Sequence, residues 1–393
     1  MERMNSNKIL LSEILLLVLP LTVQIYNIVA EKLEAQPFPG YLVTLIVLLA
    51  SSLFVYSRHR KNTLLFSSYK YAIAFSCLSL VAIFLNSDLN FNSSIRGCCS
   101  VVFVPLAFAV GNIICSEMMR SNKCYWYNLM LLLPVFSIAP MMQSILMLIG
   151  GTEFGRDSVL AISVFLPLVL MLKGKYTKLI LLIMVLYWSV ISAKRTAVLC
   201  AALALLFFLL SEILNVNVRK TYKFMALSIL LIGAGFISYN KYPEFASHVD
   251  IVLERFDNPE ENESNNERID MYQGTLNAYD SSSLFEQLFG HGYKAIEKDL
   301  YGRPTHNDLL EILYDYGVVA LLLYVIFLFS LLYGGIKAFI INKANVYLLF
   351  AVCNFLLLSM MNCMITNPAF VFVNLFCIGY SVRYTKESII SNS

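Results

Sequence analysis

The chain consists largely of long apolar runs, and these runs restrict its possible folds more than any other feature of the sequence. Most of them extend over roughly 17–25 residues, the length that an α-helix needs to cross about 30 Å of hydrocarbon. Hydrophobic residues make up 58% of the 393 residues and charged residues only 14%, whereas soluble globular proteins contain about 25% charged residues. The alternating segments of a membrane β-barrel are absent from the sequence. We therefore predict an all-α fold, a polytopic transmembrane helical bundle.

We predict about twelve spans, because each apolar run of this length can cross the bilayer once. The predicted spans are residues 9–29, 40–57, 70–86, 97–116, 125–149, 157–172, 176–193, 196–214, 222–240, 308–336, 345–364 and 367–383. The first run follows Arg3 and Lys8, as in a secretory signal. Its length of about 21 residues and the many later spans indicate an uncleaved anchor instead.

The positive charges predict how the spans are oriented, because Lys and Arg concentrate in the cytoplasmic loops of membrane proteins. With the N-terminus inside, the short cytoplasmic segments contain 18 Lys and Arg residues and the short outer loops contain five. We therefore predict cytoplasmic termini, transmembrane helices 1–9 within residues 1–240, one large external loop at residues 241–307, and helices 10–12 within residues 308–393. This topology accounts for the net charge of +3, so no nucleic-acid partner is expected.

The large loop has three parts of different character. Residues 257–270 are acidic and rich in Asn, which is typical of a solvated segment. Apolar residues at helical spacing within 267–280 predict a short amphipathic helix, lying on the membrane surface or over a cavity. Residues 288–293 form a turn with two glycines. The loop contains none of the nine cysteines, so we expect neither a disulfide framework nor a metal site. The apolar positions of the predicted helix are Ile269, Tyr272, Leu276 and Tyr279.

Lys194 and Arg195 form almost the whole turn between two predicted spans, on the outer side, where the charge rule disfavours cations. One interpretation is an ordinary turn with side chains that extend to the interface. The other is a phosphate-binding site, since the planar guanidinium of arginine binds phosphate oxygens in bidentate fashion.

His306 lies where the large loop meets the tenth predicted span. Thr305, with Asp308 three residues on, predicts a capping box in which Thr305 is the N-cap. His306 would then lie in the first turn, where the helix dipole disfavours imidazolium and leaves a neutral ring that can accept a proton. The alternative is a structural or merely exposed histidine.

Further charged residues accompany this helix start. Arg268 closes the acidic tract, either as a functional cation or as a loop cation balanced by Glu267 and Asp270. Acidic residues recur at helical spacing at the start of the tenth span, and in a first turn they complement the helix dipole. They are Asp308, Glu311 and Asp315. Only Asp315, about two turns into the span, is deep enough to suggest a role of its own.

Three motifs, taken in order, resemble the O-antigen polymerase and ligase superfamily of bacterial envelope glycan assembly. Ser192 to Ala197 resembles its Ser-x-x-Arg segment. Arg268 to Tyr272, followed by Leu288 to Tyr293, resembles its Arg-to-Gly-x-Gly stretch. His306 to Leu310, continuing through Tyr316 to Ala320, resembles its His-Asn…Gly signature. His291 departs from the pattern, since a small apolar residue usually stands between the two glycines.

The resemblance implies a metal-independent glycosyltransferase without a cofactor, at the periplasmic face of the bacterial inner membrane. The donor would be a glycan on polyprenyl diphosphate, and the acceptor a sugar hydroxyl. Arg195 and Arg268, with Lys194, would stabilise the leaving diphosphate, and His306 would act as the base. Expected partners are the lipid bilayer and lipid-linked oligosaccharides, with a chain-length regulator and a flippase as further candidates. The remaining residues expected to bind substrate are Asn307, Gly290, Gly292 and Asp315.

Polymerase is favoured over ligase, because the acidic, Asn-rich insert looks matched to one repeat unit. A polymerase would use a second lipid-linked oligosaccharide as acceptor, and a ligase the lipid A core. A lipid-linked oligosaccharide transporter would need charges or broken helices in the middle of the membrane, which the apolar runs do not suggest. A non-catalytic scaffold would leave Lys194, Arg195 and His306 unexplained.

Overall fold

The computed structural model describes most of the chain. The described residues are 38–59, 69–85, 91–124, 127–129, 132, 155–192, 194–214, 233, 237, 239–257, 263–343 and 345–392. The predicted spans at 9–29, 125–149 and 222–240 lie wholly or largely outside them. The described residues form helices and connecting segments without a strand, which confirms the predicted all-α class.

The helices lie over the predicted spans that fall within the described residues. Four of them are long and apolar enough to cross a membrane, namely α2, α4, α9 and α14, and two shorter ones, α3 and α15, are also apolar. The elements are α2 (Phe38–His59), α3 (Tyr69–Leu85), α4 (Phe91–Arg120), α6 (Gly155–Val164), α7 (Leu166–Leu170), α8 (Lys175–Ile191), α9 (Arg195–Leu214), α11 (Pro243–Asp257), α12 (Glu263–Ser281), α13 (Leu284–Phe289), the π-helix η2 (Ile296–Tyr301), α14 (Asp308–Ile341), α15 (Tyr347–Met361) and α16 (Pro368–Asn392).

One predicted span differs from the structure. Residues 157–172 form two short helices, α6 and α7, which meet at Phe165. Pro167 stands at the start of α7, where its missing N–H and fixed φ favour the beginning of a helix over the continuation of one.

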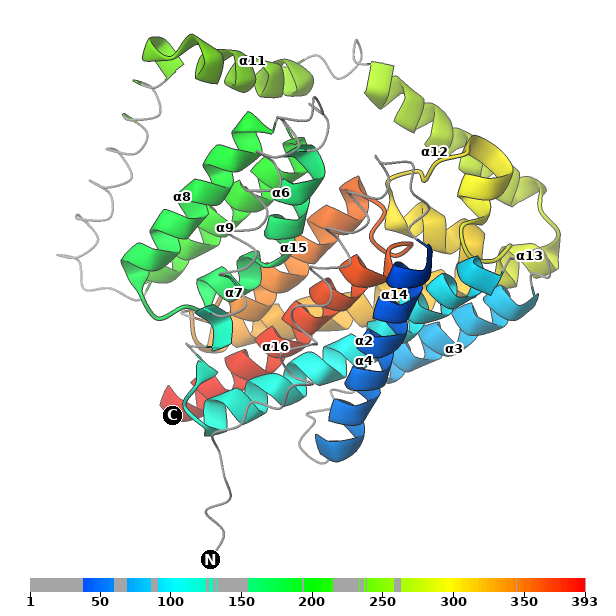
Figure 1. Ribbon diagram of the computed structural model, residues 1–393, viewed down its shortest axis with the longest axis horizontal. Coiled ribbons are helices and arrows are strands. Elements are labelled where there is room, and N and C mark those ends of the chain that lie inside the picture. The colour runs from blue at the N-terminus through cyan, green and yellow to red at the C-terminus, as the bar shows by residue number, and fades with distance from the viewer. Residues whose placement is uncertain are drawn as a thin grey trace, which may run out of the picture.

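The centre of the bundle is a closely packed group of helices. α4 packs along α16, with α2 and α3 also against it, and α14 packs between α3 and α15 (Figure 1). A Cβ placed on Gly111 would overlap the carbonyl oxygen of Phe376, and one on Gly379 would overlap that of Phe108. Glycine therefore allows the backbones of α4 and α16 to approach closely, as small residues do between membrane helices.

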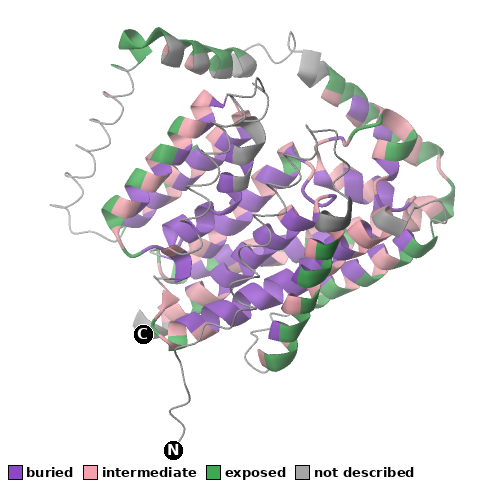
Figure 2. Ribbon diagram, viewed as in Figure 1, coloured by how far each residue is buried: buried purple, intermediate pink, exposed green. Residues whose placement is uncertain are grey.

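The outer helix faces are apolar but exposed. Figure 2 shows the buried residues in the middle of the bundle and exposed ones along its outer helices. On α8, Tyr176 is 75% exposed, and on α14, Phe329 and Tyr333 are 65% and 68% exposed. Large apolar side chains around the outside are suited to contact with lipid.

The elements of the large loop lie at one end of the bundle. α12, α13 and η2 gather there together with the start of α14, and α11 lies beside α8 (Figure 1). We call this end the loop end. The other end, where α8 and α15 begin and α9, α14 and α16 finish, is called the opposite end. Since α9 finishes at the opposite end, its first residue, Arg195, lies at the loop end.

The predicted amphipathic helix exists, but it buries a different face. It forms part of α12, which packs against α14 and η2. Met271 and Thr275 are buried, and the predicted Tyr272 and Tyr279 are half-buried. The other two predicted positions, Ile269 and Leu276, are 51% and 43% exposed. The contact with α14 therefore overrides the apolar pattern, and the polar Thr275 is buried with its hydroxyl donating to the carbonyl of Met271 at 2.7 Å.

Helix α14 breaks near its start, at Gly317 (φ 82°, ψ 168°). Its 34 residues would extend about 51 Å as one helix, well beyond the hydrocarbon thickness of about 30 Å. Residues 318–341 alone extend about 36 Å and are long enough to cross. The turns before Gly317 can therefore belong to the loop end.

Candidate functional site

The site is built around a joint between two chain segments, α13 and the break in α14. Gly290 and Gly317 both have φ near +80° and extended ψ, a conformation that is essentially limited to glycine. A Cβ on Gly290 would overlap the backbone of Asp315, and one on Gly317 would overlap that of Leu288. Two glycines are thus needed for the two backbones to touch.

The joint satisfies backbone groups that the break leaves unpaired. The carbonyl oxygens of Tyr314 and Asp315 cannot bond normally across a break at Gly317. They accept instead from the N–H groups of His291, at 3.0 Å, and Gly292, at 2.7 Å. The predicted turn at 288–293 therefore fastens the large loop to α14.

His291, the departure from the family pattern, also has a structural explanation. Its ring stacks on that of Tyr314, with 4.1 Å between centroids. Its Nε2 lies 3.0 Å from the hydroxyl oxygen of Ser282, at the end of α12. The histidine therefore links α12 to α14, which a small apolar residue could not do.

Three buried carboxylates follow one another along the first turns of α14. Asp308, Glu311 and Asp315 each have no exposed surface. Their spacing of three and four residues places them on one helix face. The interpretation of Asp308 and Glu311 as dipole partners is therefore incomplete, because an acid that serves only the dipole can stay in solvent.

Each carboxylate holds a different chain segment. Asp315 accepts from the backbone N–H of Lys294 at 2.8 Å and of Ile296 at 3.3 Å, which fixes the start of η2. Asp308 accepts from the N–H groups of Met364 and Ile365, at 2.7 and 2.9 Å, and from the Ser359 hydroxyl at 2.5 Å. Asp308 thereby ties the α15–α16 connection to α14.

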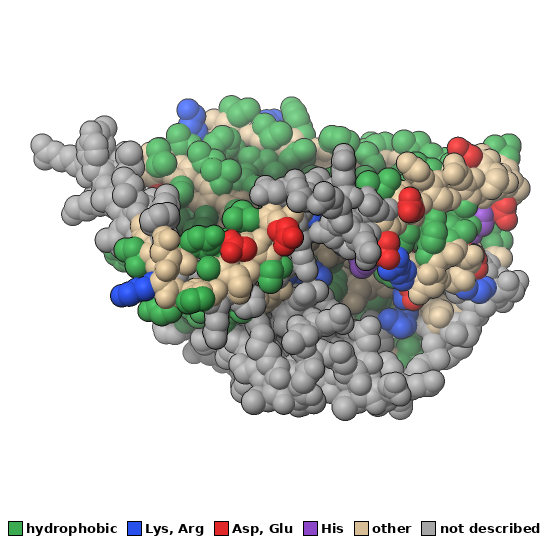
Figure 3. Space-filling model, turned by 90° about the horizontal axis from the view of Figure 1, so that it is seen from above, with side chains coloured by type: hydrophobic (Ala, Val, Ile, Leu, Met, Phe, Trp, Pro, Cys, Tyr) green, Lys and Arg blue, Asp and Glu red, His purple; other side chains and the backbone are tan. Residues whose placement is uncertain are grey.

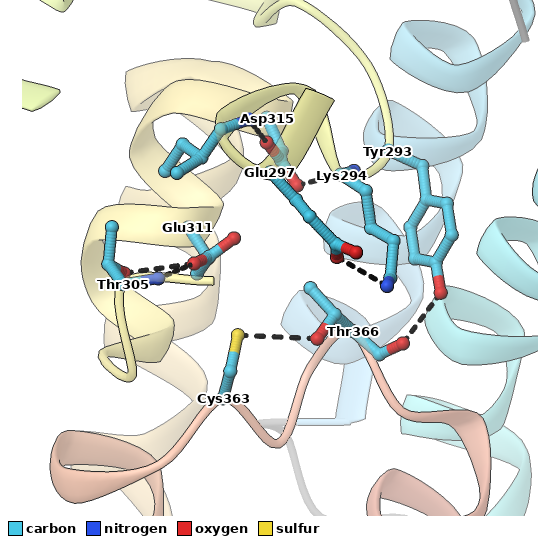
Figure 4. Close-up of polar contacts among 9 residues, drawn as sticks. Tyr293, Lys294, Glu297, Thr305, Glu311, Asp315, Cys363 and Thr366 are labelled. Atoms are coloured by element: carbon cyan, nitrogen blue, oxygen red, sulfur yellow. Dashed lines mark hydrogen bonds and ion pairs between the residues drawn. The ribbon is translucent and has the colours of Figure 1, made fainter. Parts of the chain in front are cut away.

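Glu311 holds the residue before His306. One of its oxygens accepts from the backbone N–H of Thr305 at 2.6 Å and from its hydroxyl at 2.9 Å. Figure 4 shows this pair beside the contacts of Asp315 with Lys294, of Lys294 with Glu297, and of Tyr293 with the carbonyl of Thr366. These contacts gather η2, α14 and the α15–α16 connection into one largely buried polar cluster, at which Lys294 and Glu297 stay partly exposed.

The predicted capping box at Thr305 is wrong. The N-cap of α14 is Asn307, whose side-chain oxygen accepts from the N–H of Leu309 at 3.0 Å and of Leu310 at 3.4 Å. Thr305 cannot cap, because Glu311 holds its hydroxyl. Asn307, predicted as a substrate-binding residue, uses its side-chain oxygen for the cap.

His306 lies between these two fixed residues. It is half-buried and has a left-handed φ of 60°. Such a conformation is uncommon outside glycine and persists only where the surroundings maintain it. His306 therefore stands at the loop end, where the large loop meets α14, but it precedes the N-cap Asn307, so its predicted place in the first turn of the helix is wrong.

The predicted cations come from two further elements. Lys194 and Arg195 are half-buried at the start of α9, and α15 packs against both α9 and α14. Arg268 is half-buried on α12, which packs against α14. Glu267, which could have balanced Arg268, pairs instead with Arg303 at 3.0 Å. Figure 3 shows charged side chains of both signs gathered towards the side where α12 and α13 lie.

The structure therefore brings some of the predicted site residues together and leaves the others on separate elements. Gly290, Gly292 and Asp315 meet at one joint, with polar groups engaged by the chain itself. Sequence reasoning missed the importance of Glu311 and Thr305. The available signal was an acidic residue every three or four positions at the start of an apolar helix, because burying a carboxylate there is costly.

Comparison with known proteins agrees with this organisation. The family model for O-antigen ligase matches residues 177–325. This segment runs from α8 into α14 and includes Arg195, Arg268, His306 and the break at Gly317. No curated protein matches the chain. The match supports the resemblance of this region to the O-antigen polymerase and ligase superfamily, whose members are glycosyltransferase-like membrane enzymes.

Proposed function

We propose that this protein is a polymerase of O-antigen or a similar surface polysaccharide, in the bacterial inner membrane. It would transfer a glycan from polyprenyl diphosphate to a lipid-linked repeat unit at the periplasmic face. The observation that carries the proposal is the restrained left-handed turn at His306, within the region that matches the family. A strained residue held by its neighbours is a frequent feature of active sites.

The proposed reaction needs one base and one group of cations. His306 accepts the proton of the acceptor hydroxyl as its oxygen attacks the anomeric carbon of the donor. The bond from that carbon to the diphosphate breaks, and the polyprenyl diphosphate leaves with both electrons. Arg195 and Arg268, with Lys194, stabilise its growing negative charge, so no metal is needed for this step.

The half-burial of the three cations supports this assignment. A guanidinium in a partly dry site stabilises developing charge more strongly than one in water. The proposal gives a smaller part in substrate binding to four predicted residues, Asn307, Gly290, Gly292 and Asp315. Their described hydrogen bonds shape the site, and any contact with substrate would come from their remaining backbone and side-chain atoms.

A transporter is less well supported than a transferase. The structure does contain a broken helix and buried carboxylates, features that transporters also use. They lie in the first turns of α14, however, and residues 318–341 after the break can span the membrane without them. In the part of α14 that the structure describes, buried charge therefore accompanies the helix end rather than a position at mid-membrane.

The surface glycan of a deletion strain tests the proposed function. Single repeats on the lipid core would support the polymerase. Bare core with accumulated lipid-linked polymer would mean a ligase, and single repeats retained on the cytoplasmic side would mean a transporter. Plasmid-borne wild-type protein should restore long chains in each case, which controls for effects on neighbouring genes.

A further inference from the structure

We propose that Glu311 is a positioning residue that holds His306 in its reactive orientation through Thr305. The proposal rests on the proposed function of His306 and assigns a second residue to the same site. Glu311 itself need not touch the substrate. It acts on the main chain of the residue immediately before the base.

The contact between Glu311 and Thr305 is suited to this task. Both residues have no exposed surface. One carboxylate oxygen receives the backbone N–H and the hydroxyl of Thr305, at 2.6 and 2.9 Å. Hydrogen bonds to a charged acceptor are about twice as strong as those between neutral groups. The backbone bond fixes the peptide plane between Pro304 and Thr305, and the hydroxyl bond fixes the Thr305 side chain, so that both hold the residue that precedes His306.

The other side of His306 is fixed as well. Asn307 caps α14, and Asp308 binds the backbone of Met364 and Ile365. His306 is therefore held between two anchored residues, with a φ of 60°. Removing the Thr305 anchor would allow the chain to relax towards the commoner negative φ, which would turn the imidazole away.

Glu311 does not act as an ordinary capping residue. In a capping box, the acidic side chain reaches back three residues to the N-cap. Glu311 reaches back six residues to Thr305, which precedes the N-cap Asn307. Its other oxygen has no hydrogen-bond partner among the described residues. Burying a carboxylate is costly, and both of the hydrogen bonds that Glu311 accepts from Thr305 act on the turn that contains His306.

Four variants separate positioning from general stability. Glu311→Ala removes both bonds, and Glu311→Gln keeps an acceptor oxygen for Thr305. Thr305→Val removes the hydroxyl bond and keeps the backbone bond. Ser359→Ala is the matched control, because it removes one hydrogen bond of Asp308, a buried carboxylate of the same helix, and leaves the two backbone bonds by which Asp308 anchors the chain after His306.

Two measurements on the purified full-length protein test the proposal. The first is the rate of polymer formation from a lipid-linked repeat unit, resolved into kcat and KM. The second is the rate at which diethyl pyrocarbonate modifies His306, followed by mass spectrometry with His291 as the internal reference. The second measurement does not depend on enzymatic activity.

For Glu311→Ala we expect kcat to fall about 100-fold with KM little changed, as misplacement of a catalytic group by about 1 Å can produce. The modification rate of His306 should change relative to His291. Glu311→Gln should restore most of both properties, Thr305→Val should be intermediate, and Ser359→Ala should resemble wild type.

Unchanged kcat and unchanged His306 modification in Glu311→Ala would overturn the proposal. So would a loss of kcat in Glu311→Ala and Ser359→Ala alike, without any specific change at His306. An active His306→Ala variant would instead refute the proposed role of His306, and the modification rates would still show whether Glu311 positions it.

Discussion

The two ends of the helical bundle use their charged residues in different ways. At the loop end, Asp308, Glu311 and Asp315 are buried and bind backbone N–H groups of other segments. Side-chain ion pairs occur there as well, but they are partly exposed. At the opposite end, the described charges pair with side chains. Examples are Lys175 with Glu212, Lys178 over the ring of Tyr347 at 6.0 Å, and Arg383 with Glu387 at 2.6 Å.

The backbone differs in the same way. The described residues with left-handed φ lie between Gly290 and Gly317, except for Asn122. Asn122 follows the end of α4, where a left-handed residue is an ordinary helix terminator. The loop end therefore uses its buried carboxylates to hold unusual main-chain geometry, whereas the opposite end uses its charges within and between regular helices. This difference suggests that chemistry takes place at the loop end.

The largest effect should come from His306→Ala. Loss of a general base typically reduces the rate by roughly 10²–10⁴-fold, so long-chain glycan should disappear while single-repeat material remains. The measurement is the length distribution of surface glycan at matched protein level. Long chains in this variant would remove His306 from the mechanism and weaken the contrast between the two ends.

Substitution of Arg195 should have the next largest effect on activity. If it binds diphosphate in bidentate fashion, Arg195→Lys should be nearly as damaging as Arg195→Ala, with a loss of about 10²-fold in rate. Arg120, at the end of α4 and 58% exposed in its side chain, provides the comparison at the opposite end. Arg120→Lys should retain wild-type glycan length. Full activity of Arg195→Lys would reduce Arg195 to a simple positive charge.

The regular parts of this fold could be predicted from the sequence. The predicted span at 196–214 corresponds to Arg195–Leu214, and that at 345–364 to Tyr347–Met361. Hydrocarbon thickness sets the length of an apolar helix, so its position depends little on distant residues. The start of α14 depends on contacts that no local pattern contains.

Two similar sequence patterns illustrate the limit of prediction from local sequence. Thr305 and Asp308 were predicted to form a capping box, but the hydroxyl of Thr305 is held by Glu311. Ser283 and Glu286 have the same spacing and do form one, at the start of α13. The spacing is identical, but at the start of α14 both side chains have other partners, Glu311 for Thr305 and the α15–α16 connection for Asp308. The burial of Asp308 could not be predicted either, because its partners lie more than fifty residues away.

Substitution of two glycines in α14, one at the break and one in the regular helix, compares strained with regular backbone. Gly317→Ala should destabilise the protein by about 3 kcal/mol or more, since it combines a forbidden conformation with overlap against Leu288. Gly334→Ala should be neutral or stabilising, because its Cβ would meet only Leu348, at 3.9 Å. Thermal unfolding in detergent measures both. Equal stability of the two variants would contradict the break at Gly317.

Substituting one carboxylate at each end of the bundle compares the stability that the two ends derive from their charges. Asp308→Ala leaves two buried N–H groups without an acceptor and should cost roughly 1–3 kcal/mol of stability. Glu212→Ala removes a side-chain pair whose lysine is 46% exposed, and should cost less than about 1 kcal/mol. Thermal unfolding again provides the measurement. A larger loss for Glu212→Ala would reverse the distinction drawn between the ends.

The smallest effect concerns pH and the exposed capping box of α13. Hydrogen bonds from the Ser283 side chain and backbone N–H lower the pKa of Glu286 from its usual 4.5. A carboxyl whose pKa is lowered by folding adds stability above its unfolded pKa and loses it as the pH falls through the folded value. Glu286→Gln should therefore reduce hydrogen-exchange protection of α13 slightly at pH 7 and not at pH 3. The same variant should leave the protection of α8, at the opposite end, unchanged at both pH values. A uniform loss along both helices would mean that Glu286 supports the whole bundle and that the ends are less independent than their contacts indicate.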